Sequence, residues 1–224
     1  MLRHIFLFIL ILFSPVVAAE TFSPAKSLAN LANNPNYVDL STIPGIAIDL
    51  RYASQNNFLN ENLYKEFNRA FLHQLAAEKL KRAVESLKAT KPGWQIVVLD
   101  ALRPRSIQKI LWSKVKGTSQ QPYVANPGKG SIHNFGFALD VTLLDREGKE
   151  VDMGTPFDSF TSLAQPIREN EFLTQGKLSE QQIKNRKILR SAMESAGFSQ
   201  LAIEWWHYDA LPALEVRKKY PIIE

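Results

Sequence analysis

Apolar residues recur at helical spacing in three parts of the chain. In residues 71–90 they are Leu75, Leu80, Ala83, Val84 and Leu87, which would share one face of a helix. Residues 107–115 and 179–195 have the same periodicity, with Ser179 as a candidate N-cap and Gly197 as a stop for the last segment. The pattern predicts three amphipathic helices.

Five other segments have the short apolar or alternating patterns of β-strands: residues 37–40, 46–51, 94–99, 136–144 and 203–208. In the fourth, Asp140 shares one face with the small residues Ala138 and Thr142, which leaves space above the carboxylate. Helices and strands do not alternate regularly along the chain. We therefore expect an α+β fold with a central, mainly antiparallel sheet and flanking helices.

The N-terminal segment has the three parts of a secretory signal peptide. Arg3 supplies a positive charge, residues 5–13 are uninterruptedly apolar, and the small residues 17–19 fit a cleavage site after Ala19. The apolar run is short for a membrane-spanning helix. We expect residues 1–19 to be removed, residues 20–36 to form a flexible lead-in, and residues 37–224 to form a single domain without stable membrane insertion.

The charge balance and the absence of cysteine limit which kinds of partner and metal site the chain can have. Without Arg3 the chain has 26 basic and 22 acidic residues, a modest excess that we interpret as solvated helix faces and not as a nucleic-acid groove. The sequence contains no cysteine, so an exported form would depend on its core alone for stability. A zinc site would have to use His, Asp or Glu. No sequence feature indicates an oligomeric state.

Two of the four histidines have unusual neighbours. His4 lies in the signal segment, and His73 is expected on the surface at the start of a helix. His133 closes a glycine-rich loop seven residues before Asp140, and His207 lies three residues after Glu204. Two imidazoles and one carboxylate could hold a catalytic zinc ion with a position free for water, and an unligated carboxylate could accept the proton of that water.

Spacing alone leaves a structural role for these residues open. In a regular strand, Glu204 and His207 would point to opposite faces of the sheet, as would His133 and Asp140. A shared site therefore requires His133 in the loop before its strand and a bend or strand end near Glu204. Two Ser-x-x-Lys matches, at Ser106 and Ser113, lack the companion motifs of serine acyl enzymes.

Five ordered motifs stand out along the chain. The two strongest are Ser-Ile-His-Asn-Phe-Gly-Phe-Ala-Leu-Asp at residues 131–140 and Glu-Trp-Trp-His at 204–207, and the others lie at residues 49–53, 100–104 and 152–158. Together they resemble the VanX-type D-alanyl-D-alanine dipeptidases, zinc peptidases of family M15 related to D,D-carboxypeptidases and to the hedgehog domain. The resemblance covers most of the mature chain and implies the hedgehog and D,D-peptidase type of α+β fold.

The resemblance also implies roles for single residues. One zinc ion per chain would be held by His133, Asp140 and His207, with Glu204 as general base and then acid. Arg103 would stabilise the oxyanion at the scissile carbonyl. Three further residues would line a small substrate cavity, with Asp158 as partner of the substrate ammonium: Tyr52, Ser131 and Asp158.

The expected reaction is hydrolysis of D-Ala-D-Ala or a closely similar small dipeptide. The signal segment departs from the cytoplasmic location usual in this family, and predicts a protein of the periplasm or cell envelope. One alternative is a D,D-carboxypeptidase or endopeptidase acting on muropeptides in an open cleft. Another is a non-catalytic, zinc-bearing binding module, which would need neither Glu204 nor Arg103.

Overall fold

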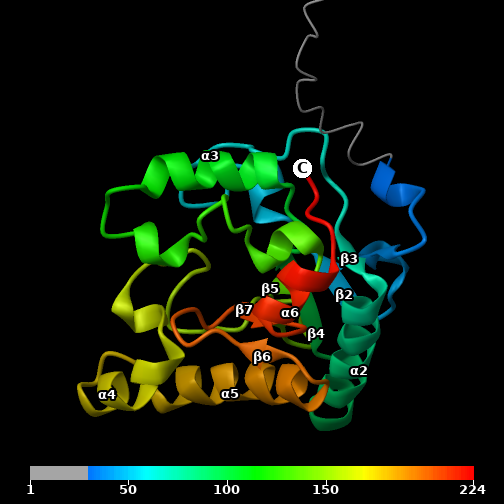
Figure 1. Ribbon diagram of the computed structural model, residues 1–224. Helices are drawn as coiled ribbons and strands as arrows, with labels where there is room; N and C mark the ends of the chain where they lie inside the picture. Colours follow the sequence, from blue (N-terminus) through cyan, green and yellow to red (C-terminus); the bar gives the residue numbers. More distant parts are fainter. Residues whose placement is uncertain (1–29) are drawn as a thin grey trace, which may run out of the picture.

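A five-stranded sheet forms the centre of the protein in the computed structural model, which describes residues 30–224 (Figure 1). Its strand order is β2-β4-β5-β7-β6, and only the β2–β4 pairing is parallel. Strands β1 and β3 form a separate antiparallel pair. The strands are β1 (Tyr37–Asp39), β2 (Ile46–Ile48), β3 (Phe71–His73), β4 (Gln95–Asp100), β5 (Ala138–Leu144), β6 (Ser199–Gln200) and β7 (His207–Asp209).

Helices surround this sheet, with α3 on one side and α4 and α5 on the other, as Figure 1 shows. The longest helix, α2, packs against α5 and β4. The α-helices are α2 (Gln74–Thr90), α3 (Arg105–Val115), α4 (Glu169–Thr174), α5 (Glu180–Ser195) and α6 (Ala213–Lys219). Ser179 caps α5, accepting a hydrogen bond from Gln182 N at 3.2 Å, as predicted. The predicted α+β fold with a mainly antiparallel sheet is confirmed.

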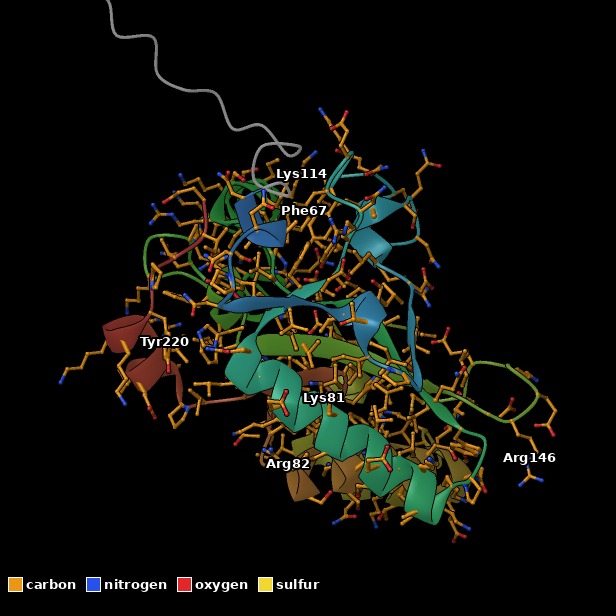
Figure 2. The ribbon with its side chains drawn as sticks, turned by 90° about the vertical axis from the view of Figure 1, so that its right-hand side faces the viewer. Phe67, Lys81, Arg82, Lys114, Arg146 and Tyr220 are labelled. Atoms are coloured by element: carbon orange, nitrogen blue, oxygen red, sulfur yellow. The ribbon has the colours of Figure 1, made fainter. Side chains whose placement is uncertain are left out.

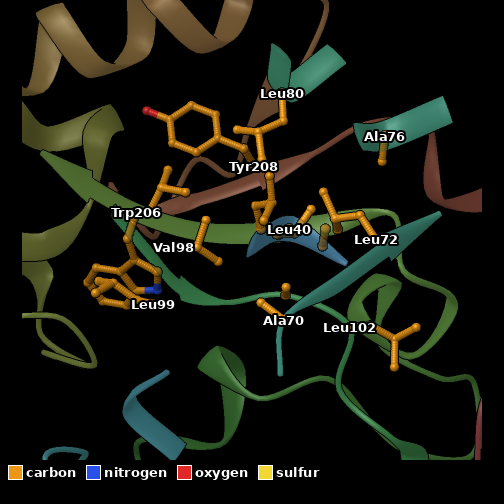
Figure 3. Packing of buried hydrophobic residues seen from close by; sticks show 14 of the residues in the cluster. Leu40, Ala70, Leu72, Ala76, Leu80, Val98, Leu99, Leu102, Trp206 and Tyr208 are labelled. Carbon is orange, nitrogen blue, oxygen red and sulfur yellow. The ribbon is translucent and has the colours of Figure 1, made fainter. Parts of the chain in front are cut away.

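The core is nearly continuous through the described residues and includes both faces of the sheet. Figure 3 shows its centre, where side chains from α2, β3, β4 and β7 meet. Helix α2 turns its charged side outward, and Lys81 and Arg82 lie on its exposed face (Figure 2). This agrees with the interpretation of these basic residues as a solvated surface.

The first predicted helix was placed too early in the chain. Residues 71–73 form β3, and His73 is buried and caps α2 instead of lying on the surface. Its ring stacks on Phe137 at a centroid distance of 4.5 Å. Leu75, which we assigned to the apolar face, is 48% exposed. Helical periodicity identified the helix but not its start, because a three-residue strand carries too little pattern of its own.

The predicted signal peptide, residues 1–19, and residues 20–29 of the predicted lead-in lie outside the described residues. Residues 30–36 lie within them, and Leu31 packs in the core. Over residues 30–224, no helix has the length and apolar character needed to cross a bilayer.

Candidate active site

Strand register places three polar residues side by side in the middle of the sheet. Asp140 on β5 lies opposite His207 on β7 and opposite Asp100 on β4. A register shift between Val98 and Asp100 lets the Asp100 side chain share the face of Asp140, as a β-bulge does. Asp100 is the last residue of β4, Asp140 the third of β5 and His207 the first of β7, and this row forms the floor of the site.

His133 reaches this floor from the short helix η4 (Ile132–Phe135), which precedes β5. Gly136 ends that helix with a φ of 75°, a left-handed conformation that glycine adopts without strain. The turn directs the chain into β5 while leaving His133 outside the strand. This is the arrangement that a shared site of His133 and Asp140 requires.

The three predicted ligands present their donor atoms to a common point. His133 Nε2 lies 3.1 Å from His207 Nδ1 and 3.4 Å from Asp140 Oδ1, and the last two atoms are 3.1 Å apart. Donors about 2.0–2.1 Å from a tetrahedral ion would be about 3.3–3.4 Å from one another. The residues therefore fit a small divalent cation, and this is the cluster in residues 30–224 that could hold a metal.

Both imidazoles are oriented from behind by a second hydrogen bond. His133 Nδ1 lies 2.7 Å from the Ala101 carbonyl oxygen, and His207 Nε2 lies 3.0 Å from Asp209 Oδ1. With protons on these nitrogens, the opposite ring nitrogens are free to ligate. Asp209 was not predicted, although its position two residues after His207, on the same face of a strand, was a signal for it.

Glu204 lies in the turn before β7, since the observed strand is shorter than the predicted 203–208 segment. The side chain can therefore face the site, and its Oε2 is 3.9 Å from His207 Nδ1. Burial raises the pKa of the Glu204 carboxyl to about 8. A carboxyl whose pKa lies near neutral pH can both accept and release a proton.

Arg103 is fixed in a buried network at the exit of β4. Its Nε and Nη2 donate to Asp100 Oδ2 at 2.8 and 2.6 Å, and its Nη1 donates to Gln108 Oε1 at 2.8 Å. Nη2 also lies 3.5 Å from Asp140 Oδ2. The residue is 7% exposed, so its guanidinium is buried beside the proposed metal ligands.

The other predicted site residues lie around the same space. Tyr52 donates its hydroxyl to Asp158 Oδ1 at 3.2 Å, whereas the buried Asp158 Oδ2 has no hydrogen-bond partner among the described residues. Burial and the nearby Asp140 carboxylate raise the pKa of Asp158 well above its usual range. Ser131 precedes η4, and its backbone N–H donates to Asn134 Oδ1 at 2.8 Å.

A single cavity of about 260 Å³ joins all eight predicted site residues. Trp206, from the motif at residues 204–207, also lines the cavity, as do Tyr123 and Phe160, which the sequence did not indicate. A cavity with a buried metal-binding triad, an adjacent carboxyl and a fixed guanidinium can polarise a carbonyl, activate water and stabilise an oxyanion.

Comparison with known proteins gives a consistent result. Residues 33–223 match the Peptidase_M15 family model, described as D-ala-D-ala dipeptidase. The chain is 29% identical to a D-alanyl-D-alanine dipeptidase of Escherichia coli, over 86% of this chain and 92% of that protein. It is 31% identical to a protein of the same name from Synechocystis, over 64% of this chain and 72% of that protein. It is also 31% identical to one from Enterococcus faecium, over 74% of this chain and 86% of that protein.

The family match spans nearly all the described residues, including all five motifs and all eight predicted site residues. The resemblance seen in the sequence is thereby confirmed. The chain belongs to the Peptidase_M15 family of D-Ala-D-Ala dipeptidases.

Proposed function

We propose that this protein is a zinc-dependent dipeptidase that hydrolyses D-Ala-D-Ala. The observation that carries the proposal is the meeting of His133, Asp140 and His207 with Glu204 in one small cavity. The names of its relatives indicate the substrate. The donor set of two imidazoles and one carboxylate is typical of catalytic zinc.

The three ligands would leave a coordination position open to the cavity. Zinc bound there would polarise the scissile carbonyl and lower the pKa of water to about 7. Asp140 would contribute a full negative charge to the donor set, because a carboxyl binds a metal ion in its deprotonated form.

Glu204 is the general base and then the general acid. Its carboxyl is buried beside the ligands but belongs to none of the donor contacts among them. It can accept the proton of the attacking water and then deliver it to the leaving amine. The raised pKa favours this return of the proton.

Arg103 faces the position where negative charge develops on the carbonyl oxygen. The contacts with Asp100 and Gln108 hold the guanidinium in place before the reaction, so little reorganisation is needed when the charge forms. Asp158, with Tyr52 beside it, would bind the substrate ammonium through Oδ2, which has no hydrogen-bond partner within residues 30–224. Ser131 lines the same cavity and would contact the dipeptide there.

We also propose that the protein is exported and meets its substrate in the periplasm or cell envelope. The support is the charged, apolar and small-residue order of residues 1–19. Mass spectrometry of the protein purified from its host should find a mature N-terminus at Glu20. A chain that retains Met1 and fractionates with the cytosol would refute export without affecting the proposed chemistry.

The activity is tested with the mature chain, residues 20–224, on D-Ala-D-Ala, L-Ala-L-Ala and a muropeptide ending in D-Ala-D-Ala. We expect release of D-alanine from D-Ala-D-Ala, loss of activity with a chelator, and recovery on addition of zinc. Preference for the muropeptide would favour the carboxypeptidase alternative. A zinc-loaded protein inert on all three would refute the proposal and favour a binding module.

A further inference from the structure

Three aromatic rings from three separate loops pack in a row beside the cavity. Phe58 lies between η2 (Arg51–Ala53) and β3, Tyr123 ends η3 (Gln121–Tyr123), and Phe160 lies between β5 and α4. The ring centroids of Phe58 and Phe160 are 4.8 Å apart, and those of Phe160 and Tyr123 are 5.2 Å apart with nearly parallel planes. We refer to these three residues as the aromatic wall.

Hydrogen bonds hold two members of the aromatic wall in position. Gln165 Nε2 donates to the Tyr123 hydroxyl at 2.9 Å, and the Phe160 backbone N–H donates to the Asp158 carbonyl oxygen at 2.9 Å. In Figure 1 the green loop containing η3 and the yellow-green loop after β5 lie on the same side of the sheet. Moving either Phe160 or Tyr123 would break ring stacking that is favourable in itself.

The aromatic wall adjoins the group that would bind the substrate ammonium. Tyr123 and Phe160 line the same cavity as Asp158 and the metal ligands. Asp158 is 9% exposed, and its Oδ2 has no partner among the described residues. A substrate whose ammonium contacts Asp158 would therefore have its N-terminal end next to Phe160.

We propose that Tyr123 and Phe160, backed by Phe58, set the N-terminal limit of the substrate. This inference rests on the proposed function. A peptide extended beyond its D-Ala-D-Ala terminus would have to place its additional residue in the space that the rings occupy. It would also present an amide to Asp158 instead of an ammonium. The protein then accepts the free dipeptide and rejects the same sequence at the end of a stem peptide, by steric exclusion and by charge.

The test compares kcat/KM for D-Ala-D-Ala with that for Gly-D-Ala-D-Ala, using zinc-loaded protein. The variants are Phe160→Ala and Tyr123→Ala, and Gln165→Ala loosens the wall without removing a ring. Because Asp158 is a second filter, each is also made in an Asp158→Asn background. Trp94→Ala is the control, since Trp94 is a half-buried aromatic residue that does not line the cavity.

We expect Phe160→Ala and Tyr123→Ala to shift the preference toward the tripeptide by about tenfold or more, most clearly in the Asp158→Asn background. Gln165→Ala should shift it less and Trp94→Ala not at all. The inference is overturned if every wall variant keeps the wild-type preference in both backgrounds. It is also overturned if wild-type protein cleaves both peptides equally well. The proposed function survives either result. Wild-type protein inert on the dipeptide overturns the proposed function itself.

Discussion

The hydrogen bond between His207 Nε2 and Asp209 Oδ1, 3.0 Å long, orients one imidazole of the proposed zinc site. In Asp209→Ala the ring loses this partner, and the negative charge that raises the pKa of His207 is lost as well. Removing such an outer partner typically weakens metal binding by about 10- to 100-fold, or about 1.4–2.7 kcal/mol. The Asp209 side chain is 23% exposed, so water can replace part of the bond and we expect the lower part of this range.

The measurement is a zinc titration in competition with a chelator of known affinity, with circular dichroism to verify folding. The activity lost at limiting zinc should be larger than that lost at saturating zinc. Asp49→Ala is the matched control, because Asp49 is half-exposed, pairs with Arg51 and does not line the cavity. Equal zinc affinity in Asp209→Ala and wild-type protein would refute this role of Asp209.

Three other variants test the remaining groups. Arg103→Lys should lower kcat by about 10²–10³-fold and also lower Tm, because lysine keeps the charge but loses the paired contacts with Asp100; unchanged kcat would contradict the oxyanion role. Asp158→Asn should raise KM for D-Ala-D-Ala by about tenfold to hundredfold, and an unaltered KM in steady-state kinetics would exclude the ammonium contact. In metal-free protein, Glu204→Gln should raise Tm at pH 9 and not at pH 4. In the folded protein the Glu204 carboxyl has a pKa of about 8, above its ordinary value of 4.5. Its ionisation therefore lowers the free energy of unfolding by on the order of a few kcal/mol as pH rises between these two values. Equal Tm values for the variant and wild-type protein at pH 9 would count against a buried charge at this position.

The proposed metal ligands and Glu204 could be predicted from the sequence because they lie in short, specific motifs. His133 and Asp140 share one motif, and Glu204 and His207 share another. Periodicity raised a real objection for each pair, and local geometry resolved it. The turn at Gly136 keeps His133 out of β5, and β7 begins only at His207, so Glu204 is free to face the cavity.

The walls of the cavity could not be predicted in the same way. Phe58, Tyr123 and Phe160 come from loops that are far apart in the chain, and no periodic pattern links them. His73 was misplaced for a related reason. Its burial depends on Phe137 and Tyr220, which reach it only through the tertiary fold.

Glu204→Gln gives the most direct test of the central claim when zinc content and turnover of D-Ala-D-Ala are measured on the same sample. Glutamine keeps the shape of the side chain but cannot accept the proton of water, and Glu204 is not one of the three proposed ligands. We predict that the variant keeps one zinc ion per chain and releases no D-alanine, while wild-type protein releases it readily. Turnover by the variant at the wild-type rate would contradict the account, as would zinc-loaded wild-type protein that leaves D-Ala-D-Ala intact.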